Sequence, residues 1–386
     1  MMSAEISNLI DSNPMTRESQ EKLERLIRLI NKESLSGLLI HLQPNFAWLT
    51  AGGSNGVDSS RESGVGTLLV RHDGRKFALA NRIEMARLLT EELAGQDYEP
   101  VEFAWEDERA NPQFVAEVAR KLVTEQLPLG SDSVFGNATR VMEAAISRAR
   151  YRLTDDEIDR FRSLGRDAGT AIGKMAHALT PGISEQDVAR RAVDALAKVG
   201  ATSVVTLVAA DDRIKRYRHP VPTDLLWRKS LMIVVCARRD GLIASLSRIV
   251  CAGEIPDELI QRTKLTADVN AKVLAATRPG MSGAEIFGVA ARAYSDAGFP
   301  GEQQLHHQGG AIGYRTRDWV AHPLCTERVQ ERQAFAWNPS ITGTKIEETC
   351  LVLREGIEMI TTTANWPSIP VAVDGRTCLL PDVLSL

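Results

Sequence analysis

The chain has 386 residues, of which 44% are hydrophobic and 25% charged, and its formal net charge is −4. This composition is typical of a globular protein with room for two or three domains. No stretch approaches the roughly 18–20 uncharged apolar residues of a membrane span, the polar N-terminus is unlike a signal peptide, and no basic cluster is dense enough for nucleic acid. We expect a cytoplasmic protein that acts on a small molecule, without membrane or nucleic-acid partners.

The first 150 residues predict a small α/β domain. Residues 15–35 carry apolar side chains at helical spacing, and the apolar run 36–42 has the length of a strand. A second strand is predicted at 65–73, where it ends in an Asp-Gly turn signal. The elements that complete this domain are a strand at 77–80 and helices at 82–95 and 112–126.

A new domain is predicted to begin at the segment YRLTDDEIDR. Thr154 precedes three acidic residues, which is the pattern of a helix N-cap with an acidic first turn. We therefore expect domains at 1–152 and 153–386. Helices and hairpins fall in separate blocks in the second domain, which indicates an α+β class. The expected helices are 155–178, 184–199, 256–277 and 283–297, and the expected strands are 203–208, 231–238, 242–250, 333–338, 348–353 and 357–362.

Five cysteines are spread widely along the chain, and most of them lie in apolar runs. The odd number and the absence of a C-x-x-C pair argue against a disulfide framework and against a zinc site built on thiolates. Buried free thiols are the prediction.

Seven stretches, taken together and in order, resemble the pita-bread family, which includes aminopeptidase P, prolidase, methionine aminopeptidase and creatinase. The resemblance implies a C-terminal α+β pita-bread domain preceded by a smaller α/β domain of the creatinase and prolidase type. The stretches are QPNFAWLTAGG near residue 45, LTDDEIDRFRSLGRDAG at 153, LTPGISEQDVA at 179, RYRHPVP at 216, DGLIASLSR at 240, HHQGGAIGY at 306 and KIEETCLV at 345.

The resemblance also locates the family's metal ligands, which are two aspartates, one histidine and two glutamates around two divalent ions. Ser245 stands where the second aspartate is expected, and the first hairpin arm, 231–239, contains no acid. Gly310 replaces the histidine and Asn338 replaces the first glutamate. Glu347 alone matches the family pattern, and one carboxylate cannot hold two metal ions.

An alternative alignment would let Asp240 or a nearby acid serve as a ligand, but it would have to repair four separate positions. The interpretation favoured by the sequence is therefore a protein with no metal and no other cofactor.

Creatinase has the same fold, lacks the metals and hydrolyses a carbon–nitrogen bond. By that resemblance His219 is predicted to be a general acid/base, and Glu347 to hold a cationic part of the substrate. The function so implied is metal-independent hydrolysis of an amide or amidine in a small molecule that carries a carboxylate. Ser247 replaces a second creatinase glutamate, so creatine itself is not the expected substrate.

Further residues are predicted to contact the substrate. Arg61 matches the creatinase arginine that reaches the neighbouring subunit, and guanidinium suits a carboxylate. This match implies a homodimer with the site near the subunit interface. The remaining candidates are His306, His307, Arg317, Ser245 and Asn338.

Two other functions stay open at the level of the sequence. The first is a catalytically inactive pita-bread module that binds a peptide or a protein partner. The second is elimination or isomerisation in the same cavity, because a base and a polarising donor also suffice to remove a proton beside a carbonyl.

Overall fold

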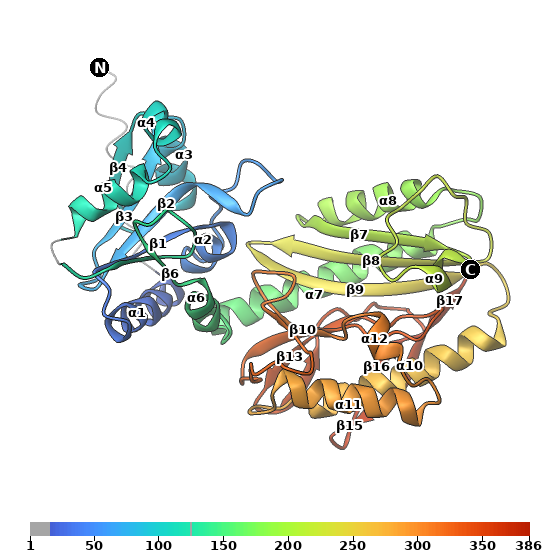
Figure 1. Ribbon diagram of the computed structural model, residues 1–386. Coiled ribbons are helices and arrows are strands. Elements are labelled where there is room, and N and C mark those ends of the chain that lie inside the picture. Colours follow the sequence, from blue (N-terminus) through green and yellow to red (C-terminus); the bar gives the residue numbers. More distant parts are fainter. Residues whose placement is uncertain (1–15, 124–125) are drawn as a thin grey trace. The chain divides into compact units, whose positions relative to one another are not determined.

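The computed structural model describes residues 16–123 and 126–386, and the chain divides into the units Met1–Arg150 and Tyr151–Leu386 (Figure 1). The division lies close to the domain limit predicted at residues 152 and 153. Within the described ranges, no helix combines the length and the apolar character needed to cross a bilayer.

The first unit is built on one mixed sheet with the strand order β4-β3-β2-β1-β5-β6. The predicted Asp-Gly turn joins β2 to β3, and Gly74 takes a positive φ of 87° there, as such a turn requires. The strands are β1 (Gly37–Leu42), β2 (Ser63–Arg71), β3 (Lys76–Asn81), β4 (Glu99–Phe103), β5 (Leu129–Ser131) and β6 (Arg140–Val141).

Helix α5 packs on one face of this sheet, where its Ala116 and Ala119 meet Leu39 and Leu69 in a buried cluster. Alternate side chains of each strand point to this face, because successive residues of a strand point to opposite sides. The helices of the unit are α1 (Arg17–Lys32), α2 (Gln43–Leu49), α3 (Met85–Arg87), the π-helix η1 (Leu88–Glu92), α4 (Trp105–Ala110), α5 (Phe114–Leu122) and α6 (Glu143–Arg150).

The second unit contains two larger sheets, with the orders β17-β9-β8-β7 and β11-β10-β12-β13-β14, and a separate β15-β16 ribbon. The larger sheets meet through β9 and β13, where the Ser245 amide donates to Thr349 Oγ1 at 2.8 Å. The strands are β7 (Thr202–Ala210), β8 (Ser230–Arg239), β9 (Leu242–Cys251), β10 (Gly309–Ile312), β11 (Trp319–Val320), β12 (Gln333–Trp337), β13 (Glu348–Leu353), β14 (Gly356–Met359), β15 (Ser368–Val373), β16 (Arg376–Pro381) and β17 (Val383–Ser385).

Helices cover the outer faces of these two sheets. Helices α7 and α8 lie on the β7–β9 side, and α10 and α11 lie on the β10–β13 side (Figure 1). The helices are α7 (Asp155–His177), α8 (Glu185–Ala197), α9 (Arg213–Arg216), α10 (Asp257–Ala276), α11 (Gly283–Asp296) and α12 (Glu302–Leu305).

The helix starts follow from their capping residues. The prediction for Thr154 is confirmed, because its side chain caps α7 and Glu157 completes a capping box. Ser282 and Glu285 form the same box at α11. These caps satisfy amide groups that the first turn of a helix leaves without partners.

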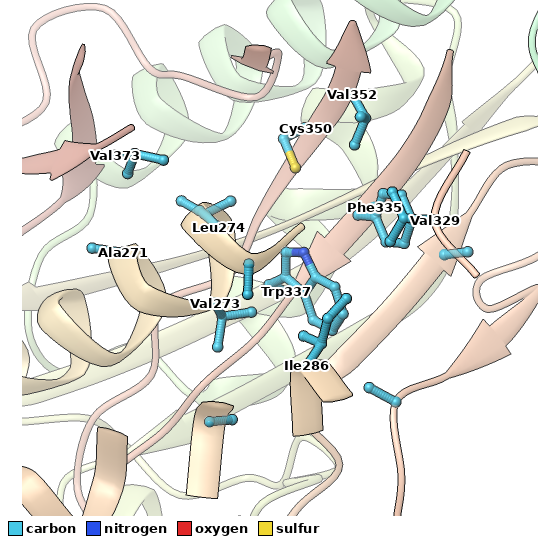
Figure 2. Packing of buried hydrophobic residues seen from close by; sticks show 14 of the residues in the cluster. Ala271, Val273, Leu274, Ile286, Val329, Phe335, Trp337, Cys350, Val352 and Val373 are labelled. Atoms are coloured by element: carbon cyan, nitrogen blue, oxygen red, sulfur yellow. The ribbon is translucent and has the colours of Figure 1, made fainter. Parts of the chain in front are cut away.

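A buried hydrophobic cluster lies between α10, α11 and the five-stranded sheet (Figure 2). Phe335 and Trp337 of β12 stack with their ring planes 9° apart, and Leu274 and Ile286 come from the two helices. Cys350 belongs to the same cluster, and four of the five cysteines are buried free thiols, as predicted, while Cys378 is partly exposed. This packing fixes β10 and β12, on which part of the candidate site is built.

Candidate active site

Three histidines converge in the second unit. His219 lies in the loop after α9, whereas His306 and His307 lie between α12 and β10. One ring nitrogen of each lies within 4.8 Å of the others, and His306 Nε2 is 3.0 Å from His219 Nε2. His306 is buried, His307 is partly buried and His219 is exposed, so the cluster joins the interior to the surface.

Ion pairs hold the His219 loop in place. Arg218 donates to Glu302 Oε2 at 2.5 Å and to Thr342 Oγ1 at 2.8 Å, which ties this loop to the helix that precedes His306. The buried Glu185 carboxylate of α8 pairs with Arg213 and accepts a hydrogen bond from the Thr223 amide at 2.9 Å. These contacts lie on both sides of His219, so its loop is fastened at both ends.

A chain of hydrogen bonds holds the backbone of His306 in place. Gln308 Nε2 donates to the His306 carbonyl at 2.6 Å, and Tyr294 Oη donates to Gln308 Oε1 at 2.7 Å. The Ser340 amide in turn donates to Tyr294 Oη at 2.8 Å. Buried networks of this kind fix the backbone from which the imidazoles project.

The imidazoles are neutral at ordinary pH. Burial, helped by the nearby Lys345 ammonium, lowers the pKa of His306 to about 3. Burial and the Arg317 guanidinium lower the pKa of His307 to about 4, and burial with Lys345 also lowers the pKa of His219. His306 Nδ1 contacts the His307 carbonyl. Since a carbonyl can only accept, Nδ1 carries the proton and Nε2 keeps a free lone pair.

A buried triple of charges lies within electrostatic range of these rings. Glu347 is only 2% exposed, and its Oε1 accepts from Arg317 Nη2 while its Oε2 accepts from Lys345 Nζ, both at 3.0 Å. Burial alone would raise the pKa of Glu347, but Lys345 and Arg317 lower it to about 2. Glu347 is thus an anion already paired by the protein, and no longer a free site for a cationic substrate.

Sequence reasoning missed Lys345, although a signal was present. Lys345 stands two residues before Glu347 in the loop that leads into β13, and residues two apart share a side wherever a chain is extended. A lysine at that spacing is therefore placed to pair with the glutamate.

Ser245 and Asn338, two other residues predicted to contact the substrate, are buried in the same unit. Ser245 is fully buried on β9, and its hydroxyl donates to Cys236 Sγ across the hairpin at 3.1 Å. Asn338 is 2% exposed, and among the described residues its Oδ1 has no hydrogen-bond partner. Asp240, considered as an alternative ligand, is exposed at the β8–β9 turn with a φ of 51°.

Arg61 belongs to the first unit, where its exposed guanidinium lies 3.1 Å from Asp58 Oδ2. Its contact with a substrate, and the homodimer that this contact implies, stay predictions.

The residues present do not fit the dinuclear metal site implied by the resemblance. A Cβ added to Gly310 would lie 2.1 Å from the Trp319 carbonyl oxygen, so no side chain fits where the family has its histidine. Both carboxylate oxygens of Glu347 already accept from cations, so a divalent ion bound to Glu347 itself would lie directly against Lys345 and Arg317. We therefore derive no step through a pair of metal ions.

Comparison with known proteins places the chain in a family. The model of metallopeptidase family M24 matches residues 159–354. The chain belongs to metallopeptidase family M24. This match covers the two larger sheets except β14 and β17, and every residue of the site described above except Arg61 and Asp58.

Relatives and solved structures agree with this family and with its fold. The Xaa-Pro dipeptidase of Lactobacillus delbrueckii is 24% identical over 57% of this chain and 62% of its own length, so the chain matches less than two thirds of that relative. A prolidase from Thermococcus sibiricus superposes with a TM-score of 0.78 at 16% identity, over 96% of this chain and 100% of that one. Dipeptidase PepE from Mycobacterium ulcerans gives 0.76 at 16% identity, over 96% and 98%. These structures confirm the predicted pita-bread fold with its smaller N-terminal domain.

The functional interpretation drawn from the missing ligands is wrong. Metal-independent hydrolysis of the creatinase type is overturned by the M24 match and by relatives named Xaa-Pro dipeptidase. The role of His219 as general acid/base stays a prediction. The two alternative functions, an inactive binding module and a lyase or isomerase, are overturned by the same comparisons. The physical reason is that loss of the five family ligands does not exclude other nitrogen donors. His219, His306 and His307 were predicted only as single catalytic or substrate contacts, and they come together in the folded chain.

Proposed function

We propose that this protein is a prolidase-like peptidase that hydrolyses short peptides with a free C-terminal carboxylate, of the Xaa-Pro dipeptide type. The names of its relatives support the reaction class. The observation that carries the substrate class is the buried Lys345–Glu347–Arg317 cluster within electrostatic range of the three histidines.

The cluster is suited to an anion. Lys345 and Arg317 carry two positive charges against the single negative charge of Glu347, so one positive charge is uncompensated within the triple. Arg317 Nε is also buried without a hydrogen-bond partner among the described residues. A guanidinium N–H left over in this way can donate to a carboxylate in a charge-assisted hydrogen bond.

Hydrolysis of a peptide bond needs an activated water molecule. In a metallopeptidase a divalent ion activates the water, because a bound ion lowers the pKa of water into the neutral range. The contribution of this chain is to hold the carboxylate end of the peptide, so that its scissile bond is positioned against the histidine cluster.

The test is proline release from a panel of Xaa-Pro dipeptides and from the same dipeptides with an amidated C-terminus, assayed with Zn²⁺, Co²⁺ and Mn²⁺ supplied in parallel. Loss of one charge-assisted contact is worth about 1.5–3 kcal/mol. We expect kcat/KM for the amides to be roughly 10- to 150-fold lower.

A matched pair of variants separates recognition from folding. Lys345→Arg keeps the positive charge and Lys345→Met removes it, so the preference for the free acid should persist in the first and shrink in the second. Equal turnover of acid and amide would overturn the substrate class, and absence of turnover with every ion would overturn the peptidase.

A further inference from the structure

We propose that His219, His306 and His307 together bind a single divalent transition-metal ion, at a site other than the family's dinuclear one. Gly310, Asn338 and Ser245 stand where the family's ligands are expected, and none of the three histidines occupies such a position. The proposal concerns metal binding alone and holds whatever the substrate is.

The spacing of the nitrogens is close to that of a metal site. Metal–nitrogen bonds of about 2.0–2.1 Å in a tetrahedral arrangement place ligand nitrogens roughly 3.3 Å apart. The Nε2 atoms of His219 and His306 are 3.0 Å apart, and the widest separation in the cluster, 4.8 Å, can close by rotation of a side chain. His219 is exposed, so its ring is the one with room to rotate.

The hydrogen bonding of the rings leaves lone pairs for a metal. His306 Nδ1 donates to a backbone carbonyl, as metal-binding histidines commonly do with their second nitrogen. Its Nε2 keeps the lone pair, which without metal accepts from His219. His307 Nδ1 is buried without a partner among the described residues, although buried ring nitrogens normally have one.

Without metal, the short contact between the two Nε2 atoms requires a proton on His219, because His306 has its proton on Nδ1. Metal binding transfers the His219 proton from Nε2 to Nδ1 of the same ring. The exchange of tautomers needs no net release of a proton at neutral pH.

The donor set and its surroundings select the ion and its fourth ligand. Three neutral imidazoles suit Zn²⁺, Co²⁺ or Ni²⁺ and leave Mg²⁺ and Ca²⁺ without the oxygen ligands that they prefer. The neighbouring Lys345 and Arg317 outweigh Glu347 by one positive charge. We therefore infer that an anion, such as a carboxylate, completes the coordination and tightens metal binding.

The experiment is a titration of chelator-treated full-length protein with Co²⁺ and with Zn²⁺, followed by visible absorption and by calorimetry, without any peptide present. We expect one ion per chain and a tetrahedral Co²⁺ spectrum. His219→Gln, at an exposed position that does not endanger folding, should weaken binding by more than about 10-fold, and His306→Gln should do the same. Addition of acetate should raise the affinity in the wild type.

His322→Gln is the matched control, because His322 is an exposed histidine of the same unit outside the cluster; it should leave the affinity unchanged. Equal affinity in His219→Gln, or no binding to correctly folded wild type, overturns the site. Two ions per chain that disappear in Glu347→Gln would show the family's dinuclear site instead. Because no substrate is present, failure of the proposed peptidase would not affect this result, and failure of metal binding would not decide the substrate class.

Discussion

Lys345 Nζ lies 3.0 Å from Glu347 Oε2, and the two side chains are only 5% and 3% exposed. The carboxylate that matches a family ligand position by resemblance is thus paired with cations of the protein itself. Arg317 completes the arrangement from the β10–β11 connection.

Removal of Glu347 should therefore be costly. Glu347→Gln leaves the buried Lys345 and the partly buried Arg317 without their counterion, and breaking a buried pair costs about 3–5 kcal/mol. We expect a loss of unfolding free energy of this size in urea denaturation. The control is Glu258→Gln, which breaks the exposed pairs with Lys215 at 2.9 Å and with Arg262 at 2.7 Å and should cost far less. Equal losses in the two variants would contradict this account of the triple.

Gly310 should tolerate no side chain. In Gly310→Ala the new Cβ would meet the Trp319 carbonyl oxygen at 2.1 Å, so β10 and β11 must separate. We expect a loss of at least about 2 kcal/mol in thermal or urea unfolding. Gly288→Ala in the middle of α11 is the comparison, since its Cβ would meet nothing closer than 3.5 Å and alanine favours a helix by up to about 1 kcal/mol. A neutral Gly310→Ala would refute the close approach.

Glu185 should control the order of the His219 loop. Glu185→Gln loses the buried ion pair with Arg213 and weakens the acceptor for the Thr223 amide. Limited trypsin digestion should then cut faster after Lys215, Arg216 or Arg218, as mapped by mass spectrometry. Asp194→Asn, at an exposed position of the same helix, should leave the cleavage rate unchanged. Protection of the loop in both variants would show that Glu185 does not anchor it.

His41 should make the protein less stable in mild acid. Burial lowers the pKa of His41 to about 4, below its ordinary 6.5, so the unfolded chain binds a proton that the folded chain does not. Stability is therefore fully present above about pH 6.5 and is lost as pH falls towards 4, by about 1 kcal/mol at roughly pH 5.5. His41→Asn can keep the bond to Thr67 Oγ1 without titrating.

The measurement for His41 is the unfolding free energy of both proteins at about pH 8 and about pH 5.5, with the drop expected to be smaller in the variant. Asp132 titrates in the same window, because burial raises its pKa to about 6, but it is present in both proteins and cancels in the difference. An identical drop in both proteins would count against His41.

The long helices and the central hairpin could be predicted from the sequence because their signals are local. Thr154 and Glu157 specify the start of α7 within four residues, and the apolar runs of β8 and β9 are continuous. Short elements such as α2, β10 and β11 were not predicted, since their few residues carry no clear period. The strands β15–β17 were not predicted either, since the last strand assigned from the sequence was 357–362.

The site was harder to predict than the fold. Each candidate could be found singly, and Arg317 and Glu347 do form a direct ion pair. What the sequence could not give is the pairing: 87 residues separate His219 from His306, and their 3.0 Å contact exists only after two loops pack together. Counting ligands position by position therefore led to the wrong conclusion about the reaction class.

The close approach at Gly310 has a consequence for how this chain can change. Its neighbour Gly309 has a φ of 101°, and a Cβ there would lie 2.1 Å from the Ala336 carbonyl oxygen. A histidine at position 310 would have to push the β11 backbone away at Trp319. On the other side, Gly309 keeps β10 close to β12 at Ala336. A histidine at this single position would therefore disturb the pairing of β10 with its neighbouring strands unless other residues changed as well.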